Sequence, residues 1–153
     1  MKLAEALSIR SQLTNKVTQL RSRLNDCVKI QEGDEISETP QQVVDELDST
    51  LTELRRIIYA INMTNTLTVD EDGRNITSLI AERDTLKQRV SILSSAVDTL
   101  TQKESRYNRS EIRYIRTVDV TEFRKIYNES AANLRKLDLH IQGLGFTTDL
   151  IEE

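Results

Sequence analysis

The regular spacing of apolar side chains constrains the fold of this chain more than any other feature. In residues 2–28, apolar side chains recur at intervals of three and four, with Arg10 as the exception: Leu3, Ala6, Leu13, Val17, Leu20, Leu24 and Cys27. That spacing places them along one face of an α-helix, in the pattern of a coiled-coil seam. We therefore predict a helix from about Lys2 to Val28.

A second helix is predicted from about Pro40 to Asn65. Thr39 and Gln42 have the spacing of a capping box, in which each side chain accepts a hydrogen bond from the backbone N–H of the other residue. Pro40 suits the first helical position, because an N–H there would have no partner within the helix. The predicted buried face of this helix consists of Val44, Leu47, Leu51, Leu54, Ile58, Ile61 and Asn65.

A third helix with the same periodicity is predicted from about Thr77 to Tyr107. After it, residues 109–120 are rich in β-branched and aromatic side chains, so a short extended segment is expected there. The predicted seam of the third helix consists of Leu79, Arg83, Leu86, Val90, Leu93, Val97, Leu100, Glu104 and Tyr107.

The fourth predicted helix begins near Asp119, whose spacing to Glu122 resembles a helix start. We expect Gly143 and Gly145 to stop it, since glycine is common just after a helix. Its predicted seam consists of Val120, Phe123, Tyr127, Ser130, Leu134, Leu137, Ile141 and Leu144.

Together these segments predict an all-α fold: an elongated antiparallel bundle of about four helices, three of them long, in a single domain over residues 1–153. Aromatic residues make up 4% of the chain, so the core is expected to be aliphatic. Apolar residues outside the seams are typical of a partner surface, and we therefore expect a homo-oligomer. The alternative is a monomer whose helices bury a wider face. The residues outside the seams are Leu7, Ile9, Val43, Ile57, Ile80, Ile92 and Ile126.

Several short motifs follow one another along the chain: QEGDE (31–35) with Pro40 after it, INMTNT (61–66), AERDTL (81–86), RYNRSEI (106–112), TVDV (117–120) and LRKLDLHIQ (134–142). This ordered set resembles the septicolysin-like family of small bacterial helical proteins, over nearly the whole chain. One departure is Gly145-Phe146, where that family tends to carry Asn-Trp. The resemblance implies an oligomer-forming helical protein and its name suggests a cytolysin, but it assigns no role to any residue.

The short linker at 68–74 predicts that the second and third helices are antiparallel neighbours. That pairing would bring Asn62 and Asn65 close to Arg83 and Asp84. The four side chains are predicted to form a buried polar cluster. It would be either a ligand or anion pocket, or a hydrogen-bonded clamp that fixes how the helices pair. Both interpretations stay open on the sequence alone.

Charge is distributed unevenly along the chain. Residues 26–53 contain nine acidic side chains and one Lys, whereas residues 103–116 contain five basic and two acidic ones. We expect the acidic loop of one subunit to contact the basic segment of another. A nucleic-acid site is the alternative, but a net charge of −4 disfavours it, and no nucleic-acid partner is expected. The residues assigned to the subunit contact are Glu32, Asp34, Glu35, Arg106, Arg109, Arg113 and Arg116.

No set of residues indicates catalysis, a bound metal or a cofactor. Cys27 lies on the first seam, which favours a buried structural thiol, and the single His140 has no companion ligand. The DEDG sequence at 70–73 lacks the ligand positions of a calcium loop, so it is predicted to be a solvated turn. We therefore expect no enzyme, no metal site and no cofactor.

The start of the chain includes Glu5 and Arg10, unlike a secretory signal, and the apolar run at 57–61 is too short to span a membrane. A cytoplasmic protein is expected. The leading hypothesis is a non-enzymatic protein with a structural or interaction role. Two alternatives come from other classes: a membrane-active, pore-forming protein whose helices expose apolar faces to lipid, and a small-molecule-binding helical enzyme that uses Arg83 and Asp84.

Overall fold

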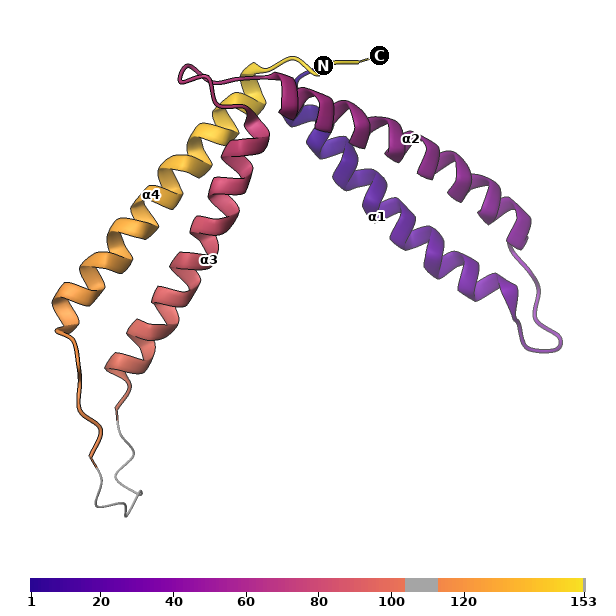
Figure 1. Cartoon of the computed structure of the whole chain (residues 1–153). Helices are drawn as coiled ribbons and strands as arrows, with labels where there is room; N and C mark the ends of the chain where they lie inside the picture. The colour runs from indigo at the N-terminus through magenta and orange to yellow at the C-terminus, as the bar shows by residue number, and fades with distance from the viewer. Residues whose placement is uncertain (104–112, 153) are drawn as a thin grey trace. The chain divides into compact units, whose positions relative to one another are not determined.

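The computed structural model describes residues 1–103 and 113–152, and the regular structure in them is helical (Figure 1). Two isolated β-bridges occur and no strand is formed in these ranges. The prediction of an all-α fold with four helices is confirmed. The helices are α1 (Leu3–Val28), α2 (Pro40–Leu67), α3 (Ile76–Thr101) and α4 (Val120–Thr147).

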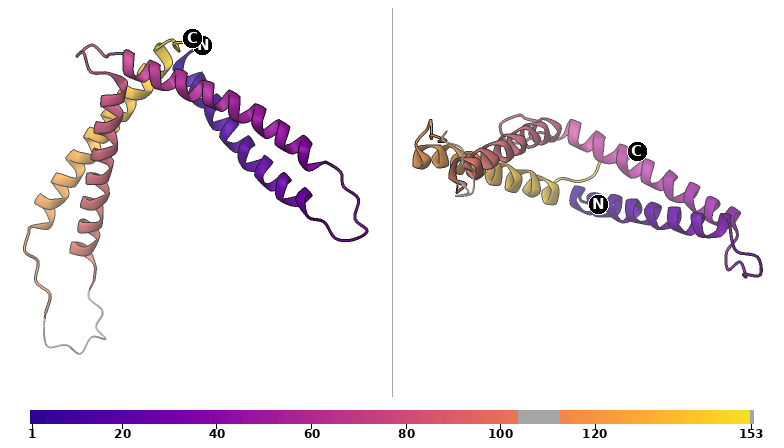
Figure 2. Two further views of the ribbon diagram at one scale, coloured as in Figure 1. Left: turned by 45° about the vertical axis from the view of Figure 1, so that its right-hand side comes forward. Right: turned by 90° about the horizontal axis from the view of Figure 1, so that it is seen from below.

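The chain divides into two compact units. The terminal unit comprises Met1–Ile76 together with Gly143–Glu153, and the central unit comprises Thr77–Gln142. In both views of Figure 2, α1 and α2 lie side by side in the terminal unit, and α3 and α4 lie side by side in the central unit. Each unit is therefore built around a pair of helices, and the single domain over 1–153 stays a prediction.

The start of α2 is capped as the sequence predicts. Gln42 N donates to Thr39 Oγ1 at 3.3 Å, and Thr39 N donates to Gln42 Oε1 at 2.9 Å. These reciprocal bonds satisfy two backbone donors that a helix start leaves without partners. The predicted capping box is thus confirmed, with Pro40 in the first turn.

The contact between α1 and α2 confirms the predicted buried face of α1 and corrects that of α2. Leu51 and Ile58, which the sequence placed in the seam, are 42% and 39% exposed. Val43, which it placed outside the seam, is fully buried. The face of α2 that contacts α1 is therefore rotated from the predicted one. The buried side chains are Leu3, Ala6, Leu13 and Leu20 of α1, and Val43, Thr50, Ile61 and Thr64 of α2.

Two threonines explain this rotation. Thr50 Oγ1 donates to Glu46 O and Thr64 Oγ1 donates to Ala60 O, both at 2.8 Å. Because each hydroxyl group is satisfied inside the helix, the rest of the side chain packs as a small apolar group without leaving a buried donor unpaired. The spacing of Leu, Ile and Val alone therefore does not predict a buried face that includes threonine.

The residues after α4 complete the terminal unit. Leu150 N donates to Met1 O at 2.8 Å, and Ile151 N donates to Thr64 Oγ1 at 2.9 Å. The Leu150 side chain is buried. The chain from residue 148 therefore connects the start of α1 with the end of α2, and we call residues 148–152 the closing segment.

Gly143 and Gly145 lie inside α4, so the prediction that they stop the helix is wrong. Glycine disfavours a helix interior by only about 1 kcal/mol, which tertiary contacts can outweigh. Gly145 is buried, and a Cβ built at this position would lie 3.9 Å from Ala4 Cβ. The glycine thus sits where α4 passes close to α1.

In the central unit, α3 and α4 are antiparallel neighbours. Arg83 Nε lies 3.9 Å from Asp138 Oδ1, and Arg89 Nη1 donates to Ser130 Oγ. Ser130 is buried, as is Leu137 about two turns further along α4. Both residues belong to the predicted seam of this helix, so that prediction is confirmed.

The third helix is shorter than predicted. It ends at Thr101, and residues 102–103 are not helical. Arg116 Nε donates to Leu100 O at 3.1 Å, which satisfies one of the carbonyls that a helix end leaves without a partner. The rest of the predicted helix, up to Tyr107, lies outside the described residues.

The connection before α4 is irregular where it is described. Residues 113–119 form neither helix nor strand, and residues 109–112 of the predicted extended segment lie outside the described ranges. Glu122 N donates to Asp119 Oδ1 at 2.9 Å. The predicted start of the fourth helix is therefore confirmed.

Candidate functional site

A partly exposed row of apolar side chains runs along α2, on the flank that the sequence predicts to be buried. We call it the outer stripe: Leu47, Leu51, Leu54 and Ile58. Its members are spaced by four, three and four residues, which is the spacing of a coiled-coil seam. Leu51 and Ile58 are exposed, and Leu47 and Leu54 are half-buried. A stripe of this kind can accept the apolar face of a further helix.

Two opposite charges border the outer stripe. Asp48 directly follows Leu47, and Arg55 directly follows Leu54. The two charged residues are one heptad apart, so they lie on the same side of the stripe. Both side chains are exposed. Neither forms an ion pair with a partner in residues 1–103 or 113–152. The other side of the stripe, where Thr50 lies, packs against α1 and is therefore not accessible to a partner helix.

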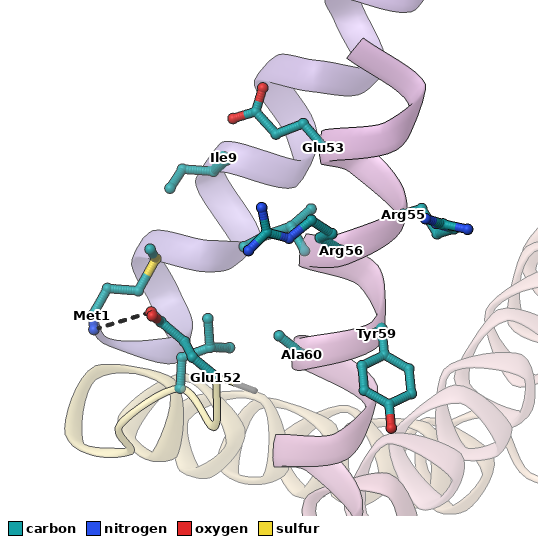
Figure 3. Close-up of a pocket in the computed structure, with 10 residues that line it drawn as sticks. Met1, Ile9, Glu53, Arg55, Arg56, Tyr59, Ala60 and Glu152 are labelled. Atoms are coloured by element: carbon teal, nitrogen blue, oxygen red, sulfur yellow. Dashed lines mark ion pairs between the residues drawn. The ribbon is translucent and has the colours of Figure 1, made fainter. Parts of the chain in front are cut away.

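A pocket of about 610 Å³ opens on another flank of the terminal unit (Figure 3). Ile9 and Ala60 contribute apolar walls, and Arg56 extends from α2 towards α1 in Figure 3. Met1 N lies 3.8 Å from Glu152 Oε1 at its edge. Because both acidic and basic residues line the pocket, Glu53 and Glu152 with Arg55 and Arg56, it does not favour an anion over a cation.

Four charged side chains join α1 to the start of α2 at the far end of this helix pair. Arg23 bonds Glu38 through two nitrogens, one of them Nε at 3.1 Å from Oε2, and its Nη1 lies 2.9 Å from Glu46 Oε2. Lys16 Nζ lies 3.2 Å from Glu46 Oε1. We call this group the charge clamp. It fixes how the two helices align, since each cation of α1 has a carboxylate opposite.

The charge clamp shifts the ionisation of its members. Hydrogen bonds from Arg23 lower the pKa of Glu38, and those from Lys16 and then Arg23 lower the pKa of Glu46. The carboxylate of Glu38 is in turn the main reason that the pKa of Arg23 is raised. Each partner favours the charged form of the other. Because all four side chains are partly exposed, we assign the clamp to alignment rather than to chemistry.

The charge clamp is a set of residues that the sequence analysis missed. Its sequence signal is a pair of cations seven residues apart on α1, Lys16 and Arg23, facing acids eight residues apart, Glu46 and Glu38. Recognising it requires knowing that α1 pairs with α2. The sequence analysis instead paired the second helix with the third.

The predicted polar cluster has members in both units. Arg83 and Asp84 are together, with Arg83 Nη2 at 2.8 Å from Asp84 Oδ1, in the central unit. Asn62 and Asn65 belong to the terminal unit, so the cluster as a whole stays a prediction. Asn62 and Asp84 are exposed, so the prediction that the cluster is buried is wrong for them.

The predicted subunit-contact charges are at the surface where they are described. Glu32, Asp34 and Glu35 lie in the loop between α1 and α2 and are exposed. Arg113 and Arg116 are also exposed, and Arg106 and Arg109 lie outside the described residues. Nothing in the single chain tests whether the two groups meet between subunits, so that contact stays a prediction.

The DEDG turn is more ordered than a solvated turn. Asp70 is buried, and its Oδ1 accepts hydrogen bonds from Arg74 N at 2.8 Å and Asp72 N at 3.0 Å. Arg74 Nη2 also lies 3.0 Å from Asp70 Oδ2. The turn is therefore held by its first carboxylate, which closes the loop by bonding its own backbone.

Two other residues that the sequence analysis considered have ordinary surroundings. Cys27 is half-buried rather than buried, and its Sγ donates to Leu24 O at 3.4 Å. His140 is exposed on α4. Among residues 1–103 and 113–152, no group of three or more His, Cys, Asp or Glu is placed to hold a metal ion. Over the same ranges, none of the helices combines the length and apolar character that crossing a membrane requires.

The fold and its surfaces define a class: an all-α protein made of two helix pairs, with a partly exposed apolar stripe on one of them. The sequence model of the family of unknown function DUF6847 matches residues 10–150, and the chain belongs to that family. A solved structure from Corynebacterium diphtheriae, described as a functionally unknown conserved protein, has the same fold, with a TM-score of 0.91 and 36% sequence identity over 99% of each chain. A search of the curated proteins gives no match. These findings do not bear on the resemblance to septicolysin-like proteins, which stays a prediction.

Proposed function

We propose that this protein is a non-enzymatic helical scaffold that self-associates through the outer stripe of α2. The observation that carries the proposal is the exposure of Leu51 and Ile58 on a helix whose adjoining face is already covered by α1. An apolar row at coiled-coil spacing loses free energy when a second row covers it. The row therefore has the form of one half of a helix–helix interface.

The expected strength of this association follows from the stripe itself. Fully burying an exposed Leu or Ile is worth about 1.5–3 kcal/mol, and these side chains are half-exposed, so about 1 kcal/mol each is reasonable. Four such side chains on each of two copies give roughly 8 kcal/mol, which is close to the entropic cost of association. Because only the surplus over that cost appears as affinity, we expect a weak dimer whose formation depends on protein concentration.

The charged surfaces add a second component to the proposal. Glu32, Asp34 and Glu35 of one copy would meet Arg113 and Arg116 of another, because both groups are exposed and of opposite sign. Exposed pairs of this kind are weakened by salt. Reversing Asp34 and Glu35 to Lys is expected to weaken association at low salt and to have little effect at high salt.

The test is the absolute mass in solution, measured by light scattering on a sizing column at protein concentrations from about 1 to 300 μM. Each concentration is measured at about 20 mM and about 500 mM salt. A mass that rises with concentration from 17.6 kDa towards twice that value at both salts supports the apolar stripe as the interface. An oligomer lost at high salt would assign the contact to the charged loop and segment instead. A mass of one chain under all conditions refutes self-association.

A further inference from the structure

We infer that two copies of this chain pair α2 against α2 in an antiparallel orientation, with Asp48 of each copy facing Arg55 of the other. This inference rests on the proposed self-association and adds the occupant of the outer stripe and its direction. A second copy is the partner that fits, because α2 is complementary in charge to itself when one copy is reversed.

The charge of α2 changes sign along its length. Its first half, residues 40–53, contains Asp45, Glu46, Asp48 and Glu53 and no basic residue. Its second half, residues 54–67, contains Arg55 and Arg56 and no acidic residue. A parallel pair would place acidic half on acidic half, whereas an antiparallel pair places each acidic half on a basic one. The distribution of charge therefore selects the antiparallel orientation.

The position of the charges beside the stripe sharpens this inference. In a coiled coil the residues that border the apolar seam set the partner and the orientation. On α2 the border towards Thr50 is buried against α1, so only the border with Asp48 and Arg55 is open to a partner. Two-fold symmetry makes every such contact occur twice, and a dimer therefore holds two Asp48–Arg55 pairs.

The alignment follows from the centre of the stripe. When the outer stripes of two antiparallel α2 helices are aligned, Leu51 of one copy lies against Leu54 of the other. In the same alignment, Leu47 of one copy lies against Ile58 of the other. The two copies of Leu47 then lie about 16 Å apart along the helix axis, since eleven residues of about 1.5 Å separate residues 47 and 58. A parallel pair would instead bring the two copies of Leu47 into contact.

A charge exchange tests the pairing. The variants D48R and R55D are each expected to raise the dimer dissociation constant roughly tenfold at low salt, because two attractive pairs become repulsive. The double variant D48R/R55D restores both pairs and is expected to return within about threefold of the unmodified protein. The control D98R makes the same charge change at an exposed site on α3 and should leave the dissociation constant unchanged. If the double variant raises the dimer dissociation constant as much as either single variant does, the inference is wrong.

Cross-linking tests the orientation directly, in a background where Cys27 is replaced by Ala. A mixture of the L47C and I58C chains is expected to form disulfide-linked dimers on mild oxidation, whereas either chain alone should not, because a disulfide needs Cα atoms about 4.4–6.8 Å apart. Cross-linking of L47C with itself would show a parallel pair and refute the inference.

A third variant separates failure of the inference from failure of the proposed function. L51E places a charge at the centre of the stripe and is expected to weaken the dimer about a hundredfold, while I92E, at a site 69% exposed on α3, should have no effect. A dimer that survives L51E uses another surface, so self-association would stand and the α2 pairing would be wrong. If the unmodified chain has the mass of a monomer at all concentrations, the proposed self-association and the α2 pairing are both wrong. Circular dichroism of each variant checks that the helices are retained.

Discussion

Replacing Gly143 by Ala is expected to stabilise the protein, although the sequence suggests a helix stop at this residue. Gly143 lies within α4, four residues before the helix ends, and no atom lies within 4 Å of the place that a Cβ would take. Alanine is favoured over glycine in a helix interior by about 0.8–1.0 kcal/mol. Because helix ends fray, we expect about 0.5 kcal/mol here, which raises the unfolding temperature by about 1–2 °C.

The same substitution at Gly73 provides a matched control of opposite sign. A Cβ at Gly73 would also meet no atom within 4 Å, so the two sites have the same free space. They differ in backbone conformation, since Gly73 has a φ of 77°, where a side chain other than glycine is strained. Gly73→Ala is therefore expected to destabilise the protein by about 1 kcal/mol.

Both variants are measured by urea unfolding followed by far-UV circular dichroism. The expected result is a midpoint shifted up for Gly143→Ala and down for Gly73→Ala, with an unchanged slope in each case, because neither change alters the surface exposed on unfolding. A lower midpoint for Gly143→Ala would refute the reasoning, since it would mean that residue 143 does not have helical backbone in the folded chain.

Three further outcomes are expected. Leu150→Ala should lower the free energy of unfolding by about 2–3 kcal/mol, measured by urea titration, because it leaves a cavity where the closing segment is anchored. Asp70→Ala should cost about 1–3 kcal/mol in the same assay, because it removes the acceptor that holds the turn. In thermal melts at stepped pH, the contribution of Glu38 and Glu46 should be present above their ordinary pKa of 4.5 and be lost as the pH falls below it, because their folded pKa values are lowered. A double Glu38→Gln and Glu46→Gln variant should therefore lose less stability on acidification than the unmodified protein.

The helices could be predicted because local signals agree with the fold. Thr39, Gln42 and Pro40 define the start of α2 by hydrogen bonds that involve only neighbours in sequence, and the structure contains those bonds. Asp119 marks the start of α4 in the same way. Signals of this kind need no knowledge of which helices pack together.

The packing of α2 could not be predicted from apolar periodicity, because this helix carries two candidate faces. The more hydrophobic one, with Leu51 and Ile58, is exposed, and the other uses Thr50 and Thr64. Those threonines become suitable for burial only when their hydroxyl groups bond the preceding turn. Choosing between the faces requires knowing the residues of α1 that lie opposite.

The candidate site illustrates the same difficulty. The sequence predicts that Val43 and Ile57 lie outside the seam of α2, but they are buried and half-buried. The exposed residues are Leu51 and Ile58. The predicted cluster of Asn62 with Arg83 likewise depends on which helices pair, and it stays a prediction. Tertiary pairing therefore decides which residues form a surface, and sequence periodicity alone does not define it.

The closing segment has a consequence for the order in which the chain folds. The bond from Leu3 N to Thr148 O joins residues 145 positions apart, whereas the Arg89–Ser130 bond of the central unit spans 41. Contacts at larger separation form more slowly, because more chain entropy is lost before they are made. During synthesis α1 and α2 emerge early, yet Leu150 reaches them only after all of α3 and α4 have been made. The central unit is thus an insertion within the terminal unit, and it can complete its own helix pair while the terminal unit still lacks its last part.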